Sequence, residues 1–172
     1  LRDGSTVGRP MSVSEREAFA VEYWALELYK LSLAPPEPEL SREIGLITGA
    51  AGGIGRAIAR HLVDRGASLV VTDINRRGVE RLAEELNQRV GLPAGRRALG
   101  VAMDVTRDAS IQQALEATLR TFGGLDFLVS NAGVAHVAAI DRLHLAEWER
   151  SFAVNATGHF LVARRVIQLL RD

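Results

Sequence analysis

A glycine-rich turn, placed between an apolar run and a helical pattern, sets the architecture of this chain. Residues 48–55 read Thr-Gly-Ala-Ala-Gly-Gly-Ile-Gly and directly follow the short apolar run 44–47. Ile54, Ile58 and Leu62 then recur at helical spacing. We therefore expect a buried strand that passes through a tight turn into a helix, whose first N–H groups form an anion site.

Three glycines of this turn are expected to have separate roles. Gly49 suits the tight turn out of the strand, Gly53 lets a bound phosphate approach the backbone, and Gly55 lets the helix pack closely on the sheet. The G-x-x-x-G-x-G spacing differs from the usual dinucleotide fingerprint, and a glycine-rich turn alone is equally typical of an ordinary tight turn. The sequence around it has to decide between these interpretations.

Strand-like and helical patterns alternate from residue 44 onwards. Short apolar runs, typical of strands covered on both faces, occupy residues 44–48, 68–72, 98–103 and 125–130. Helical patterns begin near Gly53, Asn75 and Asp108, and a last one runs from about Leu145 to the end. Asp108 stands where an N-cap belongs. This alternation predicts an α/β fold, a Rossmann-like doubly wound parallel sheet that binds its ligand at the carboxyl ends of the strands.

Two carboxylates follow the second and third predicted strands. Asp73 lies 18 residues after Gly55, close to the spacing of an acid that accepts hydrogen bonds from both ribose hydroxyls of an adenosine. The same carboxylate would repel a 2′-phosphate, which favours NAD over NADP, although Arg76 and Arg77 follow and would offset part of the repulsion. Asp104 could accept a hydrogen bond from an adenine amino group. Each carboxylate also has a simpler interpretation, in which it caps the next helix or turn.

The fourth predicted strand ends in Ser130-Asn131-Ala132-Gly133. The Asn131 side chain can bond backbone on both sides and so brace neighbouring strands. Ala132 and Gly133 are small enough to let a cofactor pass. Four strand–turn–helix units that end in small or polar residues indicate a dinucleotide site far more strongly than any one of them alone.

These motifs together resemble those of the short-chain dehydrogenase/reductase family over about residues 44–172. Residues 48–55 resemble the family's T-G-x-x-x-G-x-G turn, and residues 130–133 resemble its N-N-A-G segment, with serine in place of the first asparagine. The resemblance implies NAD as cofactor and hydride transfer between NAD and a small alcohol or aldehyde. The cofactor-binding residues that it implies are Thr48, Gly49, Ala51, Gly53, Ile54, Gly55, Asp73, Ile74, Asp104, Val105, Asn131, Ala132 and Gly133.

Asn155, within Phe152-Ala153-Val154-Asn155, is similar to the asparagine on the fourth major helix of that family. In the family this asparagine bends the helix, and its backbone carbonyl holds a water in a proton relay. The resemblance therefore implies a catalytic role for Asn155. Without the resemblance, Asn155 would be interpreted as a solvent-facing helix residue.

The acid/base residues of that family are missing from this sequence. The family's proton donor is a tyrosine with a lysine four residues later, on the same helix face, assisted by a serine on the preceding strand. The only tyrosines here are Tyr23 and Tyr29, and neither has a lysine four residues on. We therefore expect the cofactor half of an enzyme, inactive by itself. The alternative is a non-catalytic module for NAD binding or assembly.

The residues before the first strand predict a separate helical segment. Ser14 and Glu17 have the spacing of a capping box. The helical pattern that follows, to about Leu33, is apolar on two sides, which predicts burial on this domain, on a second copy or on a neighbouring domain. Three prolines within residues 34–43 then predict an extended, stiff linker.

A second resemblance involves residues 11–40. They resemble the junction of bifunctional aldolase/dehydrogenases of rhamnose catabolism, in which a class II aldolase domain precedes the dehydrogenase. It implies that residues 1–33 are the tail of an aldolase domain in the same polypeptide, and that residues 44–172 are an incomplete NAD-binding Rossmann domain. The first residue, Leu1, favours a piece of a longer protein.

Composition narrows the remaining classes. The 21 Lys and Arg balance the 21 Asp and Glu, and a net charge of zero argues against a nucleic-acid partner. The absence of cysteine rules out disulfides and thiolate chemistry. No apolar run reaches membrane-spanning length and no signal peptide opens the chain, so we expect a cytoplasmic protein without membrane contact.

The remaining aromatic and apolar residues predict packing. The four histidines show no metal-ligand pattern, and His136 and His144 are more typical of a surface than of a substrate pocket. Trp148 and Phe152, four residues apart, are interpreted as packing residues. The last helix is rich in apolar side chains, which predicts a homo-oligomer because this helix often pairs with its counterpart in the family. These side chains are Leu161, Val162, Val166, Ile167, Leu169 and Leu170.

Overall fold

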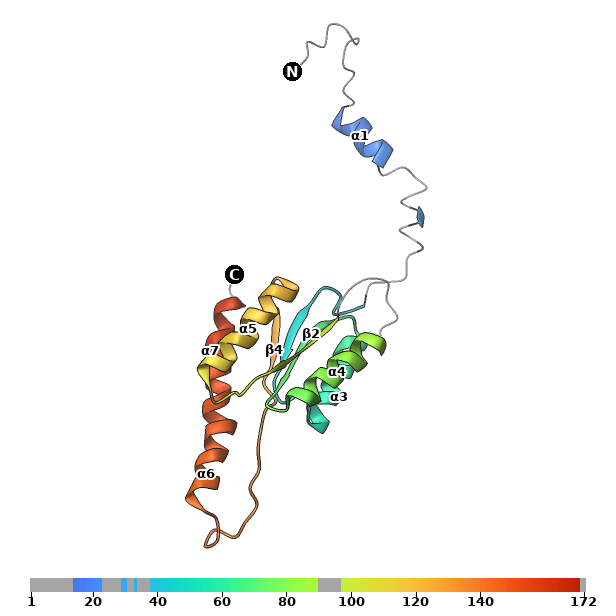
Figure 1. The fold of residues 1–172 in the computed structure, drawn as a ribbon. Coiled ribbons are helices and arrows are strands. Elements are labelled where there is room, and N and C mark those ends of the chain that lie inside the picture. The colour runs from blue at the N-terminus through green and yellow to red at the C-terminus, as the bar shows by residue number, and fades with distance from the viewer. Residues whose placement is uncertain (1–13, 23–28, 31–32, 34–37, 90–96, 171–172) are drawn as a thin grey trace. The chain divides into compact units, whose positions relative to one another are not determined.

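The computed structural model describes residues 14–22, 29–30, 33, 38–89 and 97–170 (Figure 1). The chain divides into two compact units, Leu1–Glu37 and Pro38–Asp172. In the first unit, helix α1 spans Glu15–Glu22. Its predicted capping box is confirmed, because the Glu17 N–H donates to Ser14 Oγ at 3.2 Å and the Ser14 N–H donates to Glu17 Oε2 at 2.9 Å.

Much of the predicted two-sided helix and linker lies outside the described residues, namely 23–28, 31–32 and 34–37. The prediction of an extended linker up to residue 43 is wrong for the part that is described. Residues 39–42 form a turn, in which the Leu40 N–H donates to the Arg65 carbonyl at 2.9 Å. The Leu40 side chain packs against the core, so the second unit begins at Pro38 instead of residue 44.

Four parallel strands form the sheet of the second unit (Figure 1). They are β1 (Ile44–Ile47), β2 (Ser68–Asp73), β3 (Ala98–Ala102) and β4 (Phe127–Val129), in the order β3-β2-β1-β4. Each lies within a residue or two of its predicted bounds. Because β1 pairs with β2 on one side and β4 on the other, the strand order switches direction at β1. The predicted doubly wound sheet is confirmed.

Helices cover both faces of the sheet (Figure 1). They are α3 (Gly53–Asp64), α4 (Arg76–Arg89), α5 (Asp108–Phe122), α6 (Leu145–Phe152) and α7 (His159–Leu169), with the π-helical segment η2 (Ala153–Gly158) joining α6 to α7. Alternate strand residues enter opposite cores, as a period of two requires. Ile47 and Val71 pack with α3 and α4, whereas Leu46 and Val70 pack with α5 and α7. The predicted end of the second helix at residues 91–93 lies outside the described residues.

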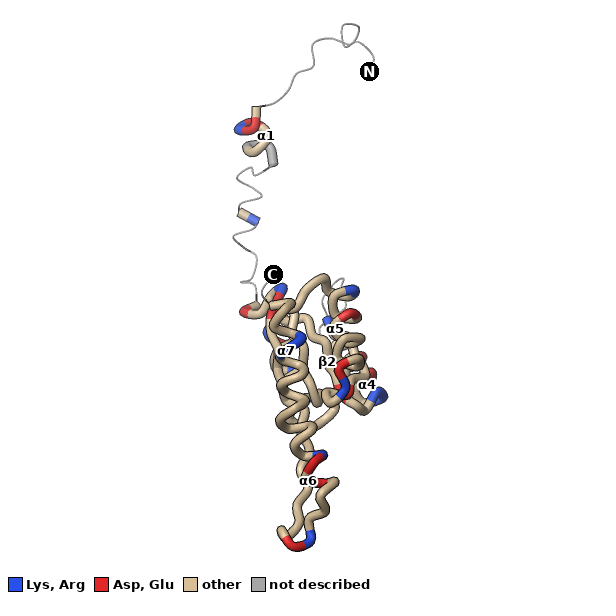
Figure 2. Tube along the Cα trace, turned by 90° about the vertical axis from the view of Figure 1, so that its left-hand side faces the viewer, with Lys and Arg blue, Asp and Glu red and all other residues tan. Residues whose placement is uncertain are grey.

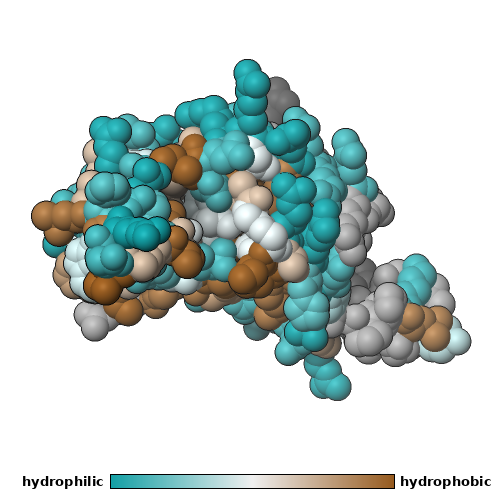
Figure 3. All heavy atoms as spheres, turned by 90° about the horizontal axis from the view of Figure 1, so that it is seen from below, coloured by the Kyte–Doolittle hydropathy of each residue, from teal (hydrophilic) through white to brown (hydrophobic). Residues whose placement is uncertain are grey.

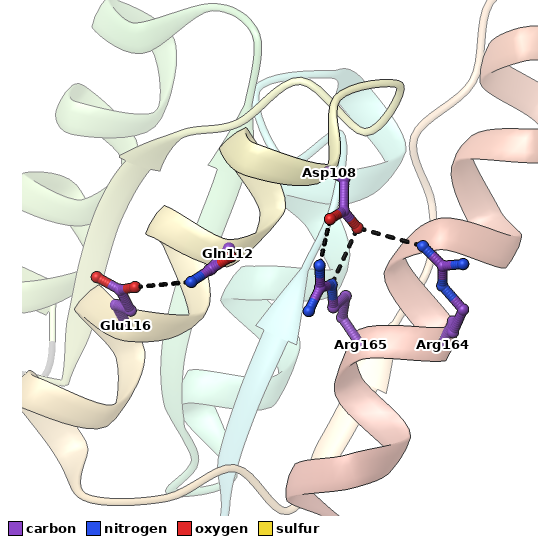
Figure 4. Close-up of polar contacts among 5 residues, drawn as sticks. All are labelled: Asp108, Gln112, Glu116, Arg164 and Arg165. Carbon is purple, nitrogen blue, oxygen red and sulfur yellow. Dashed lines mark hydrogen bonds and ion pairs between the residues drawn. The ribbon is translucent and has the colours of Figure 1, made fainter.

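The predicted N-cap at Asp108 is wrong. Arg107 is the N-cap of α5, and Asp108 is the first helical residue. The Asp108 carboxylate binds two arginines of α7 instead: it accepts hydrogen bonds from Arg165 Nε at 2.9 Å and Arg164 Nη2 at 3.4 Å, and a further one from Arg165 Nη2 (Figure 4). This hydrogen bonding to Arg165 is the main cause that lowers the pKa of Asp108.

The apolar face predicted for the last helix is only partly free. Val162 and Val166 are fully buried in the core against α5, while Ile167 and Leu170 remain exposed. Leu161 and Leu169 are half-buried against the same core. The surface available for a partner is therefore smaller than the sequence suggests.

Charges of both signs are mixed on the surface of the second unit. Figure 2 shows Lys or Arg beside Asp or Glu along α4 and again around α6. Arg60 of α3 and Glu85 of α4 form one such pair, with two parallel hydrogen bonds of 2.7 and 3.0 Å. Within the described ranges, no helix combines the length and apolar character needed to cross a membrane.

Candidate functional site

The glycine turn lies at the carboxyl end of β1, where the strand order switches. Gly49 has a φ of +64°, and a Cβ there would stand 2.8 Å from the Ala132 Cα. At Gly55 a Cβ would stand 2.4 Å from the Gly49 carbonyl oxygen. Gly49 has the positive φ that suits its predicted tight turn, and Gly55 is required by the close approach of the helix to the turn at the end of β1. A Cβ on Gly53 would meet no atom of the described residues within 4 Å, so its surroundings are open to a ligand.

The first turn of α3 presents backbone donors next to this opening. The helix is capped by Gly52, and its first intrahelical hydrogen bond runs from the Arg56 N–H to the Gly52 carbonyl at 3.0 Å. The N–H groups that precede Arg56 belong to the turn that has no intrahelical acceptor. With the positive end of the helix dipole, they suit a phosphate group.

Asp73 joins the end of β2 to the glycine turn. One carboxylate oxygen accepts the Ala51 N–H at 3.1 Å, and the other accepts the Asn75 N–H at 2.9 Å. Asp73 itself is only half-buried, so each oxygen keeps lone-pair capacity on the solvent side. The cap of α4 is Asn75, whose Oδ1 accepts the Gly78 N–H at 3.0 Å. The Asn75 N–H contact shows that Asp73 also stabilises the turn before α4, and its role in binding a ligand stays a prediction.

Asp104 lies beyond the end of β3, and its alternative interpretation is partly realised. Its Oδ1 accepts hydrogen bonds from the Thr106 N–H at 2.9 Å and the Thr106 hydroxyl at 2.7 Å, which stabilises the turn before α5. The carboxyl group is half-buried at the same time and lines the cleft described below. A turn role and a ligand contact are thus compatible at this position.

Thr48 and Asn131 bind the end of β4 to the end of β1. The fully buried Thr48 hydroxyl accepts the N–H groups of Asn131 and Ala132, both at 2.9 Å. The Asn131 amide donates to the carbonyls of Thr48 at 3.0 Å and Gly49 at 3.1 Å. Asn131 was predicted to bond backbone on both sides, and its amide nitrogen binds backbone on the β1 side. Thr48, predicted to bind the cofactor, is fully buried, and its hydroxyl shapes the turn; its contact with a cofactor stays a prediction.

The segment after β4 is attached to the helix α6–η2–α7 at two points. Asn155 Nδ2 donates to the Val134 carbonyl at 2.8 Å, and the Val134 N–H donates to Asn155 Oδ1 at 2.9 Å. The helix is irregular here, because Asn155 lies within the π-helical segment η2. Although exposed, Asn155 is thus more than a solvent-facing residue.

His159 provides the second attachment, and sequence reasoning missed it. Its Nδ1 lies 2.6 Å from the Ser130 hydroxyl and its Nε2 lies 2.9 Å from the Ala132 carbonyl oxygen. Since a carbonyl only accepts, Nε2 carries a hydrogen. In the neutral ring Nδ1 then accepts from Ser130. The spacing of four residues from Asn155 could have indicated that both side chains leave the helix on one face.

A cleft of about 110 Å³ lies among these elements. Figure 3 looks onto this end of the molecule and shows a hollow flanked by both hydrophobic and hydrophilic surface. Its lining residues are Gly49, Asp73, Ile74, Met103, Asp104, Val105, Ala132, Gly133, Val134, Arg150 and Val154. The cleft thus gathers residues from the ends of all four strands, as predicted for the switch point.

Seven of the predicted cofactor residues line this cleft: Gly49, Asp73, Ile74, Asp104, Val105, Ala132 and Gly133. Ile54 and Gly53 lie exposed at the start of α3, outside the lining. Gly55, Asn131 and Thr48 contact the backbone of the turn and do not line the cleft. The Ala51 N–H donates a hydrogen bond to the Asp73 carboxylate. Met103, Val134, Arg150 and Val154 line the cleft without having been predicted. Arg150 and Val154, spaced by four, share one helix face, which the sequence did offer as a signal.

The sequence pattern of the family described as short chain dehydrogenase matches residues 43–172. The chain belongs to the short-chain dehydrogenase family. This is a family of oxidoreductases, and the solved structures to which the chain is similar include complexes with nicotinamide cofactors.

Curated relatives are considerably longer than this chain. An uncharacterized oxidoreductase, YuxG, of Bacillus subtilis (strain 168) is 42% identical over 171 residues, which are 99% of this chain and 24% of that protein. The D-threitol dehydrogenase of Mycolicibacterium smegmatis is 39% identical over 127 residues, 74% of this chain and 47% of that protein. The chain thus spans less than half the length of both relatives.

Solved short-chain dehydrogenases share the fold. A 3-ketoacyl-(acyl-carrier-protein) reductase of Brucella melitensis, complexed with NADH, superposes with a TM-score of 0.69 at 35% identity, covering 76% of this chain and 51% of that one. An NAD⁺-bound xylitol dehydrogenase superposes with a TM-score of 0.70 at 28% identity, covering 77% of this chain and 49% of that one.

Proposed function

We propose that this chain is the cofactor-binding half of an NAD-dependent short-chain oxidoreductase that transfers hydride between NAD and a small alcohol or aldehyde. The observation that carries the proposal is the position of Asp73. Its carboxylate is fixed by the Ala51 N–H of the glycine turn, and it lines the cleft beside Ile74 and Asp104. This position supports a role for Asp73 as the acceptor for two ribose hydroxyls.

The residues present fit the adenosine and phosphate portions of NAD. The pyrophosphate would lie over Gly53 at the start of α3, where no side chain intrudes. Ala132 and Gly133 are small and line the cleft, which leaves room for the cofactor to continue past β4. When bound, the nicotinamide ring accepts or donates the hydride, while the residues of this chain bind and orient the cofactor.

NAD is favoured over NADP for an electrostatic reason. The Asp73 carboxylate would lie next to a 2′-phosphate and repel it. Of the two arginines that follow, Arg76 extends along α4, with its Nη1 3.7 Å from Glu80 Oε1. Because the ion pair between Arg76 and Glu80 is exposed, it is weak. It therefore reduces, but does not remove, the positive charge that Arg76 contributes near the ribose.

Small alcohols or aldehydes are proposed as substrates because two similar proteins are named dehydrogenases of polyols, D-threitol and xylitol. The sequence of 172 residues contains no tyrosine after Tyr29. A phenolic general acid typically contributes about 10²–10⁴-fold to such reactions. The chain by itself should therefore bind NAD without turnover, with Asn155 contributing to a proton relay only in the whole enzyme.

Calorimetric titration with NAD and NADP tests this proposal. The chain should bind NAD more tightly than NADP. Asp73→Ala should weaken NAD binding by roughly tenfold or more, since a charge-assisted hydrogen bond contributes about 1.5–3 kcal/mol, and should narrow the preference over NADP. Asp64→Ala, on the exposed end of α3, is the control. Failure of the folded wild-type chain to bind NAD would refute the proposal.

The longer relatives also support a two-domain origin, which we propose on the same footing. The match to YuxG covers 99% of this chain, so it includes residues before the dehydrogenase pattern begins at residue 43. Residues 1–33 would then end a preceding domain, such as the aldolase of a bifunctional enzyme, in the cytoplasm. Sequencing the surrounding gene would test this, and a stop codon shortly before the codon for Leu1 would refute it.

Assembly is a second candidate function, supported by exposed apolar side chains on the last helices. On α6, the ring centroids of Trp148 and Phe152 lie 4.7 Å apart, so the two rings pack on each other. The two residues are nevertheless 49% and 53% exposed. The other exposed large apolar residues of these helices are Leu145, Phe160, Ile167 and Leu170. We propose that this surface forms a homo-oligomer. Sedimentation should show self-association that Phe152→Ser weakens, and a monomer at every concentration would refute it.

A further inference from the structure

Arg150 occupies a position in the cleft that the proposed function does not yet use. Of the described residues that line the cleft, it alone carries a positive charge, and it faces a lining that contains Asp73 and Asp104. It comes from α6, four residues before Val154, and both residues line the cleft. A cation at the rim of a cleft with two carboxylates is electrostatically favoured.

Several other arginines of the described residues have protein partners. Arg164 and Arg165 bind Asp108, Arg60 binds Glu85, and Arg97 donates to the Gly66 carbonyl at 2.9 Å. Within the described part of the chain, no hydrogen bond or ion pair of this kind engages the Arg150 guanidinium. Its side chain is exposed and is therefore free to adopt a position over a ligand.

The shape of the lining indicates which part of a ligand Arg150 would meet. Ile74, at the end of β2, is 71% exposed although it is a large apolar residue. With Val105 and Val154 it supplies apolar walls on three elements. Such walls suit a flat heterocycle, and Asp73 next to Ile74 places the attached ribose. Arg150 lines the same cleft from α6.

We propose that Arg150 closes the cleft over the adenine base, with its planar guanidinium lying on the face of the ring. This inference rests on the proposed function, because it assumes that the cleft takes an adenine nucleotide. Arginine suits this contact since its delocalised charge stacks on aromatic faces, whereas a lysine ammonium is a compact point charge. Arg150 would then select for the base, while Asp73 selects for the sugar.

The test measures the binding of four ligands, AMP, NAD, NADP and nicotinamide mononucleotide, to wild type and three variants of the chain. AMP and NAD contain the adenine, and nicotinamide mononucleotide does not. Arg150→Ala should lower the affinity for AMP and for NAD by a similar factor, about 3- to 10-fold. Its affinity for nicotinamide mononucleotide should equal that of wild type. Arg150→Lys should restore less than half of the binding free energy that Arg150→Ala loses. Arg142→Ala removes an exposed arginine outside the lining and should bind like wild type.

Two results would overturn the inference while leaving the proposed function intact. One is wild-type affinity of Arg150→Ala for both AMP and NAD. The other is a loss confined to NADP, which would assign Arg150 to a 2′-phosphate instead of the base. Failure of wild-type chain to bind NAD would refute the proposed function itself. Thermal unfolding of each variant checks that the fold is unchanged, as expected for an exposed side chain.

Discussion

The two sides of β1 hold the glycine turn in different ways. On the β2 side, the Asp73 carboxylate accepts the Ala51 N–H and is still half exposed in the cleft. On the β4 side, the Thr48 hydroxyl and the Asn131 amide are used up in hydrogen bonds to backbone groups. Thr48 is fully buried. The Asp73 carboxylate on one side lines the cleft, whereas the Thr48 hydroxyl and the Asn131 amide nitrogen on the other side bind backbone groups.

This difference suggests that the β2 side recognises the ligand and that the β4 side keeps the turn rigid. A half-exposed carboxylate loses little by exchanging water for a ribose hydroxyl, so the β2 side suits ligand selection. A buried hydroxyl that accepts hydrogen bonds from two backbone N–H groups fixes the distance between the strand ends. Removing it costs much free energy, because both N–H groups are then left buried without an acceptor. Variants on the β4 side should therefore affect stability first, and variants on the β2 side should affect binding first.

The largest expected effect is that of Thr48→Val. The substitution keeps the side-chain shape but leaves the N–H groups of Asn131 and Ala132 without their acceptor. Each donor left unsatisfied costs about 1–3 kcal/mol, so the free energy of unfolding should fall by about 2–6 kcal/mol. Urea denaturation measures it. The matched control is Thr72→Val on β2, also fully buried, where the hydroxyl makes one bond, to the Ile47 carbonyl at 2.9 Å. Equal losses for the two variants would break the comparison.

A second variant tests how closely β4 lies on β1. A Cβ on Gly45 of β1 would stand 2.2 Å from the ring of Phe127 on β4. Gly45→Ala should therefore cost about 1–3 kcal/mol of stability through overpacking. Phe127→Leu in the same chain should restore part of the loss, because the smaller side chain vacates that space. Loss of stability in Gly45→Ala that Phe127→Leu does not relieve would assign the cost to the backbone.

The β2 side was largely predictable from the sequence. Its parts are local: a glycine turn with fixed spacing, a carboxylate at the end of an apolar run, and an apolar residue after it. Asp73 and Ile74 could be placed in the cleft because strand ends of a parallel sheet meet at one edge. The positive φ of Gly49 and the close packing of Gly55 also followed from the spacing.

The β4 side was less predictable because its contacts join residues far apart in the chain. Thr48 reaches Asn131 across 83 positions, and His159 reaches Ser130 across 29. A sequence shows that such groups can bond, but not with which partner. The same limit explains Asp108, whose partner Arg165 lies 57 positions away, so that a local cap was predicted instead. Arg150 was missed because its spacing of four residues from Val154 shows that the two share a helix face, but not that this face lines a cleft.

His159→Phe tests whether the β4 side contributes to rigidity alone. Phenylalanine keeps the ring but removes the contacts to the Ser130 hydroxyl and the Ala132 carbonyl. Two hydrogen bonds of about 0.5–1.5 kcal/mol each predict a loss of about 1–2 kcal/mol in stability. NAD affinity, measured by calorimetry, should change less than in Asp73→Ala. His61→Phe, on the exposed surface of α3, is the control. A large loss of affinity without a loss of stability would make His159 a recognition residue.

The smallest effect is expected at Asp108, where α5 is held to α7 by an exposed cluster. Because Arg165 lowers the pKa of Asp108 in the folded state, the ionised carboxylate stabilises the fold above the unfolded pKa of about 3.9. This contribution is lost as the pH falls through the lower folded pKa. Asp108→Asn should therefore lower the Tm at pH 7, and the gap to wild type should shrink towards pH 3 and in high salt. Glu116→Gln, whose partner is Arg120 on the same helix, should show a smaller gap. A gap that is constant across this pH range would show that Asp108 acts through packing and not through its charge.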